Sequence, residues 1–262
     1  MVMGILNLTP DSFYDGGRYD VLQEALKKTG EMLDDGAAII DVGAYSSRPN
    51  ARHITQEEEE ARLFPVLEQL LHDYPKALFS IDTFRSEIAV KSIAMGAHLI
   101  NDISGGNMDK AMFNRIAELQ VPYILMHMQG TPQNMQNNPT YGDVVQDVYK
   151  SFEKKVEKLE QLGVKDVILD VGFGFGKTLE QNYQLLQNLS QFKKLEKPLL
   201  VGMSRKSMLY KLLDKTPETS LHATGVVHTV ALMHGADILR VHDVKEAMET
   251  VKIYAMLKKA SL

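Results

Sequence analysis

Short apolar runs alternate with amphipathic segments along the whole chain. Each run spans three to six residues, and many contain consecutive Val, Ile and Leu, which is typical of strands buried on both faces. The pattern therefore predicts strands that are buried on both faces. The predicted strands are 2–6, 37–42, 78–81, 98–100, 122–126, 167–169, 199–201 and 238–242.

Helical periodicity fills the segments between these runs, most clearly over 21–34, 55–74, 144–162, 221–234 and 244–258, and a further helix is predicted between Arg85 and Met95. Thr55, with Glu58 three residues later, predicts a capping box at the start of the second helix. Eight strand–helix units follow one another without a linker, which predicts a single-domain (β/α)8 TIM barrel over residues 1–262. An open doubly wound sheet is the alternative, but it usually has fewer strands or an obvious second domain.

A polar or ionisable residue stands at the end of every predicted strand. In a (β/α)8 barrel the carboxyl ends of the strands and the loops that follow them form one mouth. Any one of these residues could cap a helix or lie in the core, but together they would converge on one cavity. They are Asn7, Asp41, Asp82, Asn101, His127, Asp170, Lys206, Arg240 and His242.

The strand-end residues divide by charge into two chemical groups. Asp82, Asn101 and Asp170 offer acceptors and an amide, which suit a flat heterocycle with several donors and acceptors. Asn7 supplies a hard oxygen ligand, the type that Mg²⁺ accepts when phosphates and waters complete its shell. The cationic residues, which suit phosphate or carboxylate, are Lys206, Arg240, His242 and, in the second loop, Arg48. The pattern predicts a heterocyclic substrate with a diphosphate leaving group.

Two loops after predicted strands have unusual sequences. Residues 7–17 are longer and richer in side-chain oxygens than a strand–helix turn requires, which indicates a functional loop. We expect residues 9–17 to close over the pocket together with residues 46–50. Residues 172–178 (GFGFGKT) fit neither the phosphate-loop spacing nor the dinucleotide fingerprint. We interpret them as a tight loop that exposes Phe173 or Phe175 to a ligand.

Composition excludes several classes of protein. The chain has 44% hydrophobic residues, a formal net charge of -5 and no cysteine. Thiol catalysis and disulfides are excluded, and nothing indicates a nucleic-acid partner. The sequence shows neither a membrane span nor a signal peptide, so we expect a soluble cytoplasmic protein.

Four motifs resemble the dihydropteroate synthase family, the sulfonamide target of folate biosynthesis. They are residues 3–13 (MGILNLTPDSF), 170–177 (DVGFGFGK), 202–206 (GMSRK) and 240–243 (RVHD). The resemblance implies a TIM barrel that condenses p-aminobenzoate with 6-hydroxymethyl-7,8-dihydropterin diphosphate to give 7,8-dihydropteroate and diphosphate. It further implies Mg²⁺ as cofactor, a dissociative displacement, sulfonamides as inhibitors and a homodimer.

The resemblance also implies a role for individual residues. The pterin would be held by Asp82, Asn101, Met126, Asp170 and Lys206. The diphosphate would be held by Asn7, Arg240 and His242, with Mg²⁺ on Asn7. The p-aminobenzoate site would consist of Ser47, Arg48, Pro49, Phe175 and Ser204. Asp82, Lys206, Arg240 and His242 would act in catalysis, with Asp82 as an electrostatic stabiliser rather than a general base.

The chain departs from the family pattern at three places that matter. Val171 replaces the usual Pro, which removes rigidity but no functional group. The second loop reads AYSSRPN over 44–50, where the family usually has Glu-Ser-Thr-Arg-Pro-Gly at the last six positions. The chain begins directly at the first predicted strand, so we expect that it lacks the usual N-terminal stretch. Two other readings compete: a pterin-binding domain that passes a methyl group from a folate to a corrinoid protein, and a degenerate barrel without catalysis.

Overall fold

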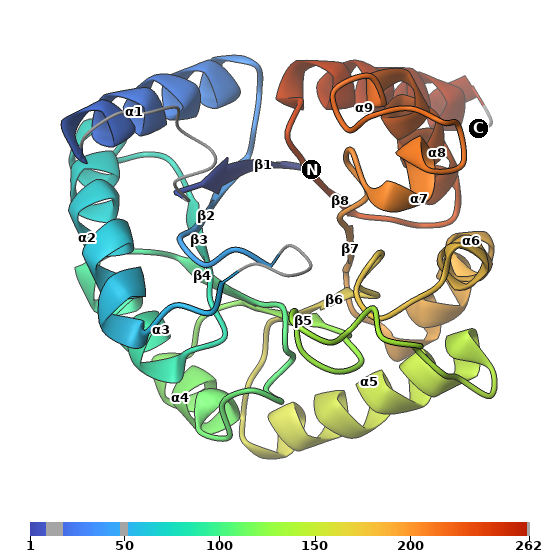
Figure 1. Ribbon diagram of the computed structural model, residues 1–262, viewed down its shortest axis with the longest axis horizontal. Helices are drawn as coiled ribbons and strands as arrows, with labels where there is room; N and C mark the ends of the chain where they lie inside the picture. Colours follow the sequence, from blue (N-terminus) through green and yellow to red (C-terminus); the bar gives the residue numbers. More distant parts are fainter. Residues whose placement is uncertain (9–17, 48–51, 261–262) are drawn as a thin grey trace.

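Eight parallel strands form a closed barrel in the computed structural model, which describes residues 1–8, 18–47 and 52–260. The strands pair in chain order, and β8 pairs with β1 to close the ring (Figure 1). This arrangement confirms the predicted (β/α)8 barrel. The strands are β1 (Val2–Asn7), β2 (Ile39–Gly43), β3 (Phe79–Asp82), β4 (Leu99–Asp102), β5 (Tyr123–Met126), β6 (Val167–Asp170), β7 (Leu199–Val201) and β8 (Ile238–Val241).

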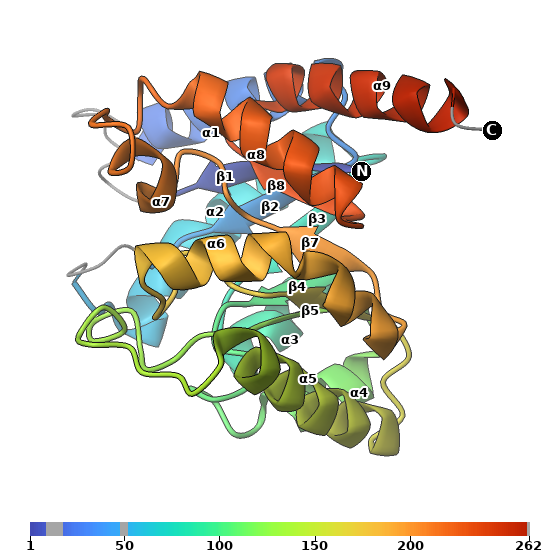
Figure 2. The same ribbon diagram turned by 90° about the vertical axis from the view of Figure 1, so that its right-hand side faces the viewer.

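Helices surround the barrel in a single outer layer (Figures 1 and 2). They are α1 (Arg18–Asp34), α2 (Gln56–Asp73), α3 (Ser86–Met95), α4 (Met112–Leu119), α5 (Val144–Gln161), α6 (Leu179–Gln187), α7 (Ser207–Tyr210), α8 (Leu221–Met233) and α9 (Val244–Ala260). A 3₁₀ segment, Leu189–Leu195, follows α6. The sequence pattern had located α1, α2, α3, α5, α8 and α9 but not the shorter helices α4 and α6.

Several strands continue one or two residues beyond their predicted ends. Asn7, Asp82, Asn101 and Asp170 all lie within strands rather than in the loops that follow. Their backbones are in the ladder: Asp82 pairs with Asn101, for example, across β3 and β4. A polar side chain does not prevent the backbone from pairing here, because strand alternation directs these side chains into the barrel while their backbones stay in the ladder.

The start of α2 shows half of the predicted capping box. Thr55 Oγ1 accepts the backbone N–H of Glu58 at 3.2 Å, which satisfies one orphan donor of the first turn. The Glu58 carboxylate instead accepts hydrogen bonds from Arg52 and, at 2.7 Å, from Arg62. The reciprocal bond was therefore a wrong prediction, because two arginines compete for the glutamate.

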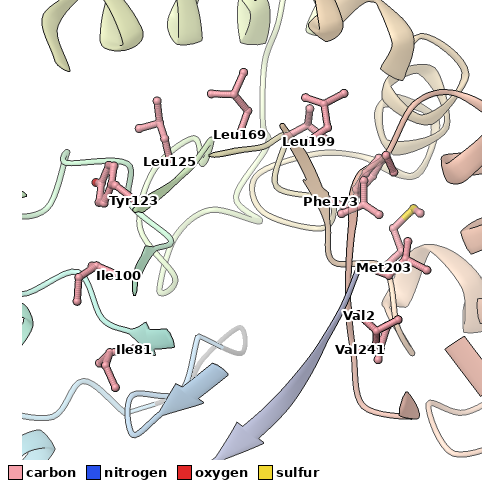
Figure 3. Packing of buried hydrophobic residues seen from close by; sticks show 14 of the residues in the cluster. Val2, Ile81, Ile100, Tyr123, Leu125, Leu169, Phe173, Leu199, Met203 and Val241 are labelled. Carbon is pink, nitrogen blue, oxygen red and sulfur yellow. The ribbon is translucent and has the colours of Figure 1, made fainter. Parts of the chain in front are cut away.

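Two apolar cores stabilise the barrel. The larger one lies between the strands and the helices, and Figure 3 shows Leu125 and Leu169 pointing outward from the barrel into it. A smaller cluster inside the barrel forms an apolar floor, which consists of Met3, Ile39, Leu99, Ile124, Leu200 and Ile238, with the partly buried Ile168 packed against it. Everything that faces the mouth lies above this floor.

Candidate active site at the barrel mouth

Polar side chains form a layer directly above the apolar floor. Residues two apart on a strand share a face, so Asp41 lies one step closer to the mouth than Ile39, and Arg240 one step closer than Ile238. The same step places the remaining members of the layer: Asn101 above Leu99, Met126 above Ile124 and Asp170 above Ile168. Each of these five strands thus places an inward-facing residue above the apolar floor.

Arg240 lies between two carboxylates from other strands. Its Nε donates to Asp41 Oδ2 at 2.6 Å, and its Nη2 donates to Asp82 Oδ2 at 2.7 Å. Asn101 Nδ2 also donates to Asp41 Oδ2, at 2.9 Å. Burial opposes the charge of the guanidinium, but Asp41 and Asp82 outweigh it and raise the pKa of Arg240. The sequence grouped Arg240 with the cations of the site, whereas the structure places it among the carboxylates.

Asp82 and Asp170, the two carboxylates predicted to contact the pterin, are both shielded from solvent. Burial raises the pKa of Asp82 to about 7; Arg240 lowers it and Asp41 raises it further. Asp170 Oδ1 accepts the Gly172 N–H at 2.8 Å. Burial also raises the pKa of Asp170, against this hydrogen bond and the charge of Lys206. Burial thus raises the pKa of both carboxylates, and a cationic ligand beside them would lower it again.

Lys206 contacts the loop after β6 in two ways. Its Nζ donates to the Phe173 carbonyl at 2.7 Å and lies 4.1 Å from the centre of the Phe175 ring. Burial lowers the pKa of Lys206 to about 8, and Asp170 opposes that effect. Phe173 is fully buried in the outer core, whereas Phe175 is half-buried and packs against the cluster that contains Met126. Of the two predicted phenylalanines, the loop therefore offers Phe175 to a ligand.

Asn7 and His242, predicted to bind diphosphate, share one cavity. Asn7 ends β1, His242 follows β8, and both line a cavity of about 470 Å³ that extends between α1 and α9. Ser204 Oγ accepts the backbone N–H of His242 at 3.2 Å and lies 3.2 Å from its Nδ1. Ser204 thus contacts His242, one of the residues predicted to bind diphosphate. The place of Ser204 in the p-aminobenzoate site stays a prediction.

The second loop is described only in part. Ser47 is half-buried at the last described position before the gap, and Arg48 and Pro49 lie outside the described residues. Tyr45, two residues earlier, accepts a hydrogen bond from Gln133 Nε2 at 2.8 Å through its hydroxyl. This bond ties the base of the second loop to the loop after β5.

Comparison with known proteins gives one consistent result. The family model described as "Pterin binding enzyme" matches residues 3–242. The dihydropteroate synthase of Escherichia coli is 44% identical over 96% of this chain and 89% of its own length. The chain belongs to the dihydropteroate synthase family. Two solved structures of the family agree with this fold: the Yersinia pestis enzyme with a sulfonamide drug complex (42% identity, 99% and 94% coverage, TM-score 0.93) and the Xanthomonas albilineans enzyme in complex with 7,8-dihydropteroate (33% identity, 98% and 93% coverage, TM-score 0.88).

Membership makes the chain a transferase. The similarity to dihydropteroate synthases runs over nearly the whole chain, including every strand of the barrel. It favours this family over the corrinoid-dependent methyltransferase considered from the sequence. Within the described part of the chain, no helix is both long and apolar enough to span a membrane.

The donor set at the mouth fits the magnesium ion that the family resemblance implies only if the substrate supplies most of its ligands. Among the described residues, no cluster of three or more His, Asp or Glu side chains is placed to hold a metal ion. Asn7 offers a single amide oxygen at the end of β1. One protein oxygen completed by diphosphate oxygens and waters is an ordinary shell for Mg²⁺.

The structure changes the interpretation of two residues, His127 and Asp41. His127 was grouped with the mouth residues, but its buried ring packs edge-on against Phe152 of α5, with centroids 6.3 Å apart, and contacts Lys177. Burial, and then Lys177, lowers the pKa of His127 to about 2, so the ring is neutral. Asp41 was grouped with the mouth residues but given no role, although it fixes Arg240 and Asn101. Its two-residue spacing from Ile39 was the available signal.

Proposed function

We propose that this chain condenses p-aminobenzoate with 6-hydroxymethyl-7,8-dihydropterin diphosphate, giving 7,8-dihydropteroate and diphosphate by a magnesium-assisted dissociative displacement. The observation that carries the proposal is the polar layer itself. It places carboxylates, an amide and two cations above a closed apolar floor, in a chain that is 44% identical to the dihydropteroate synthase of Escherichia coli. The bound 7,8-dihydropteroate of the Xanthomonas albilineans relative supports the same product.

The pterin ring would lie on the polar layer. Asp170 and Asn101 match the donor and acceptor pattern of its edge, and Met126 and Phe175 supply apolar contact. Lys206, held by the Phe173 carbonyl, would donate to a ring acceptor. Because Asp41 already fixes Asn101 and Arg240, the layer is preorganised and little ordering remains for the ligand to impose.

The carbon–oxygen bond to the leaving group breaks before the amine attacks. Its electron pair leaves with the diphosphate, and positive charge develops on the pterin methylene. Asp82 would become fully ionised beside this charge and stabilise it, while Arg240 and His242 would stabilise the departing diphosphate. Mg²⁺, when bound through Asn7 and the diphosphate oxygens, would neutralise part of the leaving group's charge.

The amine of p-aminobenzoate then forms the new carbon–nitrogen bond and releases one proton. An aromatic amine is neutral at pH 7, so no general base is needed to make it a nucleophile. Ser47, Arg48, Pro49, Phe175 and Ser204 would surround this substrate. The same site would accept sulfonamides, as in the Yersinia pestis relative crystallised with a sulfonamide drug.

One assay tests the proposal. The protein is mixed with Mg²⁺, labelled p-aminobenzoate and the pterin diphosphate, and both dihydropteroate and free diphosphate are measured. We expect equal amounts of the two products. A folded protein, verified by circular dichroism, that forms neither product would refute the function.

We also propose that the chain forms a homodimer through its last helices. Large apolar side chains stand exposed on α8 and α9, among them Met233, Ile253 and Met256, each more than 60% exposed. Light scattering coupled to gel filtration would measure the mass in solution. Ile253→Glu should shift a dimer toward monomer if this face is the interface, and an unchanged mass would exclude it.

A further inference from the structure

Lys177 is a buried lysine for which the proposed reaction has no direct use. The residue is only 3% exposed, and its Nζ contacts no carboxylate among the residues that the structure describes. It donates to the carbonyls of Gly172 and Phe175, each at 2.9 Å, and to that of His127 at 3.2 Å; His127 Nδ1 lies 3.3 Å away. Burying a lysine opposes its charge, so these acceptors must compensate for lost water.

The acceptors belong to a loop whose backbone has little freedom. Gly172 and Gly176 have positive φ, and a Cβ on them would lie 2.0 Å from the His127 carbonyl oxygen and 2.6 Å from that of Gln129. The loop 172–176 therefore packs backbone against backbone on residues 127–129. Lys177 lies between the two segments and bonds to both.

Every carbonyl of this loop has a donor. The partners, in order from residue 172 to residue 176, are Lys177, Lys206, Gln136, Lys177 again and Tyr141. Lys177 donates to the carbonyls of Gly172 and Phe175, and Lys206 donates to the Phe173 carbonyl that lies between them in the sequence. The position of that carbonyl, and of the Phe175 ring over Lys206, thus depends on how Lys177 holds the loop.

We propose that Lys177 is a positioning residue for the pterin site: it clamps loop 172–176 so that the Phe173 carbonyl and the Phe175 ring hold Lys206 in place. The inference rests on the proposed function, because its readout is the binding of the pterin diphosphate. Lys177 does not touch the substrate; it acts through the loop on Lys206.

The first test compares two lysines. Lys177→Met removes the clamp. Lys155→Met is the matched control, because Lys155 is half-buried and also donates to a loop carbonyl, that of Gly105 at 2.8 Å, but it does not contact loop 172–176. Calorimetric titration with the pterin diphosphate and Mg²⁺ should show an affinity loss of about tenfold or more for Lys177→Met. Lys155→Met should stay within about threefold of the wild type, whatever stability it loses.

A rescue experiment separates positioning from folding. The chain has no cysteine, so Lys177→Cys carries a single thiol. The unfolded variant is alkylated with 2-bromoethylamine, whereby the thiolate displaces bromide and restores an ammonium at the length of lysine. A second sample receives neutral carbamidomethyl groups from iodoacetamide. Both are refolded beside refolded wild type, and circular dichroism measures the folded fraction, so the comparison holds even if Lys177→Met does not fold.

The aminoethyl form should recover both the affinity for the pterin diphosphate and its KM, while the carbamidomethyl form should not. Wild-type affinity in Lys177→Met, or equal recovery with both alkylating reagents, would overturn the positioning role. An active wild type with unaffected variants refutes only this inference. A wild type that neither binds the pterin diphosphate nor forms dihydropteroate refutes the proposed function instead.

Discussion

Replacement of Asp82 by Asn should separate stability from catalysis. Burial raises the pKa of Asp82 from 3.8 to about 7, so the unfolded chain loses this proton at lower pH than the folded chain does. Stability due to the protonated carboxyl is present below the unfolded pKa and is lost as pH rises toward 7. At 1.36 kcal/mol per pKa unit, the shift amounts to at most about 4 kcal/mol.

Asp82→Asn has no such loss. We expect the free energy of unfolding of Asp82→Asn minus that of the wild type, measured by urea denaturation at pH 4 to 8, to increase as pH rises. Turnover should nevertheless fall by about a hundredfold or more at every pH, because an amide cannot stabilise the developing cation by charge.

Asp41→Asn is the matched comparison. Asp41 is fully buried, and its Oδ2 accepts from both Arg240 and Asn101. Its loss leaves these donors poorly paired and should cost about 1–3 kcal/mol at pH 8. The reasoning is refuted if Asp82→Asn loses as much stability as Asp41→Asn at pH 8, or if its difference from the wild type does not change with pH.

Three further outcomes are expected. Gly172→Ala would bring a Cβ to 2.0 Å from a backbone oxygen and should lose about 3 kcal/mol or more in urea unfolding, whereas Gly163→Ala, with open space around it, should lose about 1. EDTA should abolish turnover without lowering the Tm of the ligand-free protein, since Asn7 alone cannot hold Mg²⁺; a large drop in Tm would reveal a protein-only metal site. Burial lowers the pKa of Lys177 from 10.5 to about 7, so wild-type stability should rise relative to Lys177→Met from pH 7 to 9.5; a constant difference would contradict that shift.

The barrel and most of its mouth were predictable because both depend on local alternation. The eight apolar runs gave the strands, and a step of two residues from Ile39 or Ile238 leads to Asp41 or Arg240. Signals for the missed helix α6 were also present: Thr178 and Gln181 form a complete capping box in the structure.

Contacts across the barrel were not predictable in the same way. Arg240 bonds to Asp41 and Asp82, which precede it by 199 and 158 residues. Strand register and shear determine which carboxylate the guanidinium contacts, and local sequence periodicity determines neither of them. The role of Lys177 was hidden for the same reason, since one of its acceptors, the His127 carbonyl, lies 50 residues away.

The apolar floor beneath the polar layer restricts how substrates enter the site and products leave it. Met3, Ile39, Leu99, Ile124, Leu200 and Ile238 fill the barrel below the reacting groups, so ligands have no route through its lower end. Substrates and products must use the same opening. Under the proposed function, diphosphate would leave through the opening by which p-aminobenzoate arrives, and the pterin, as the deepest ligand, would enter first.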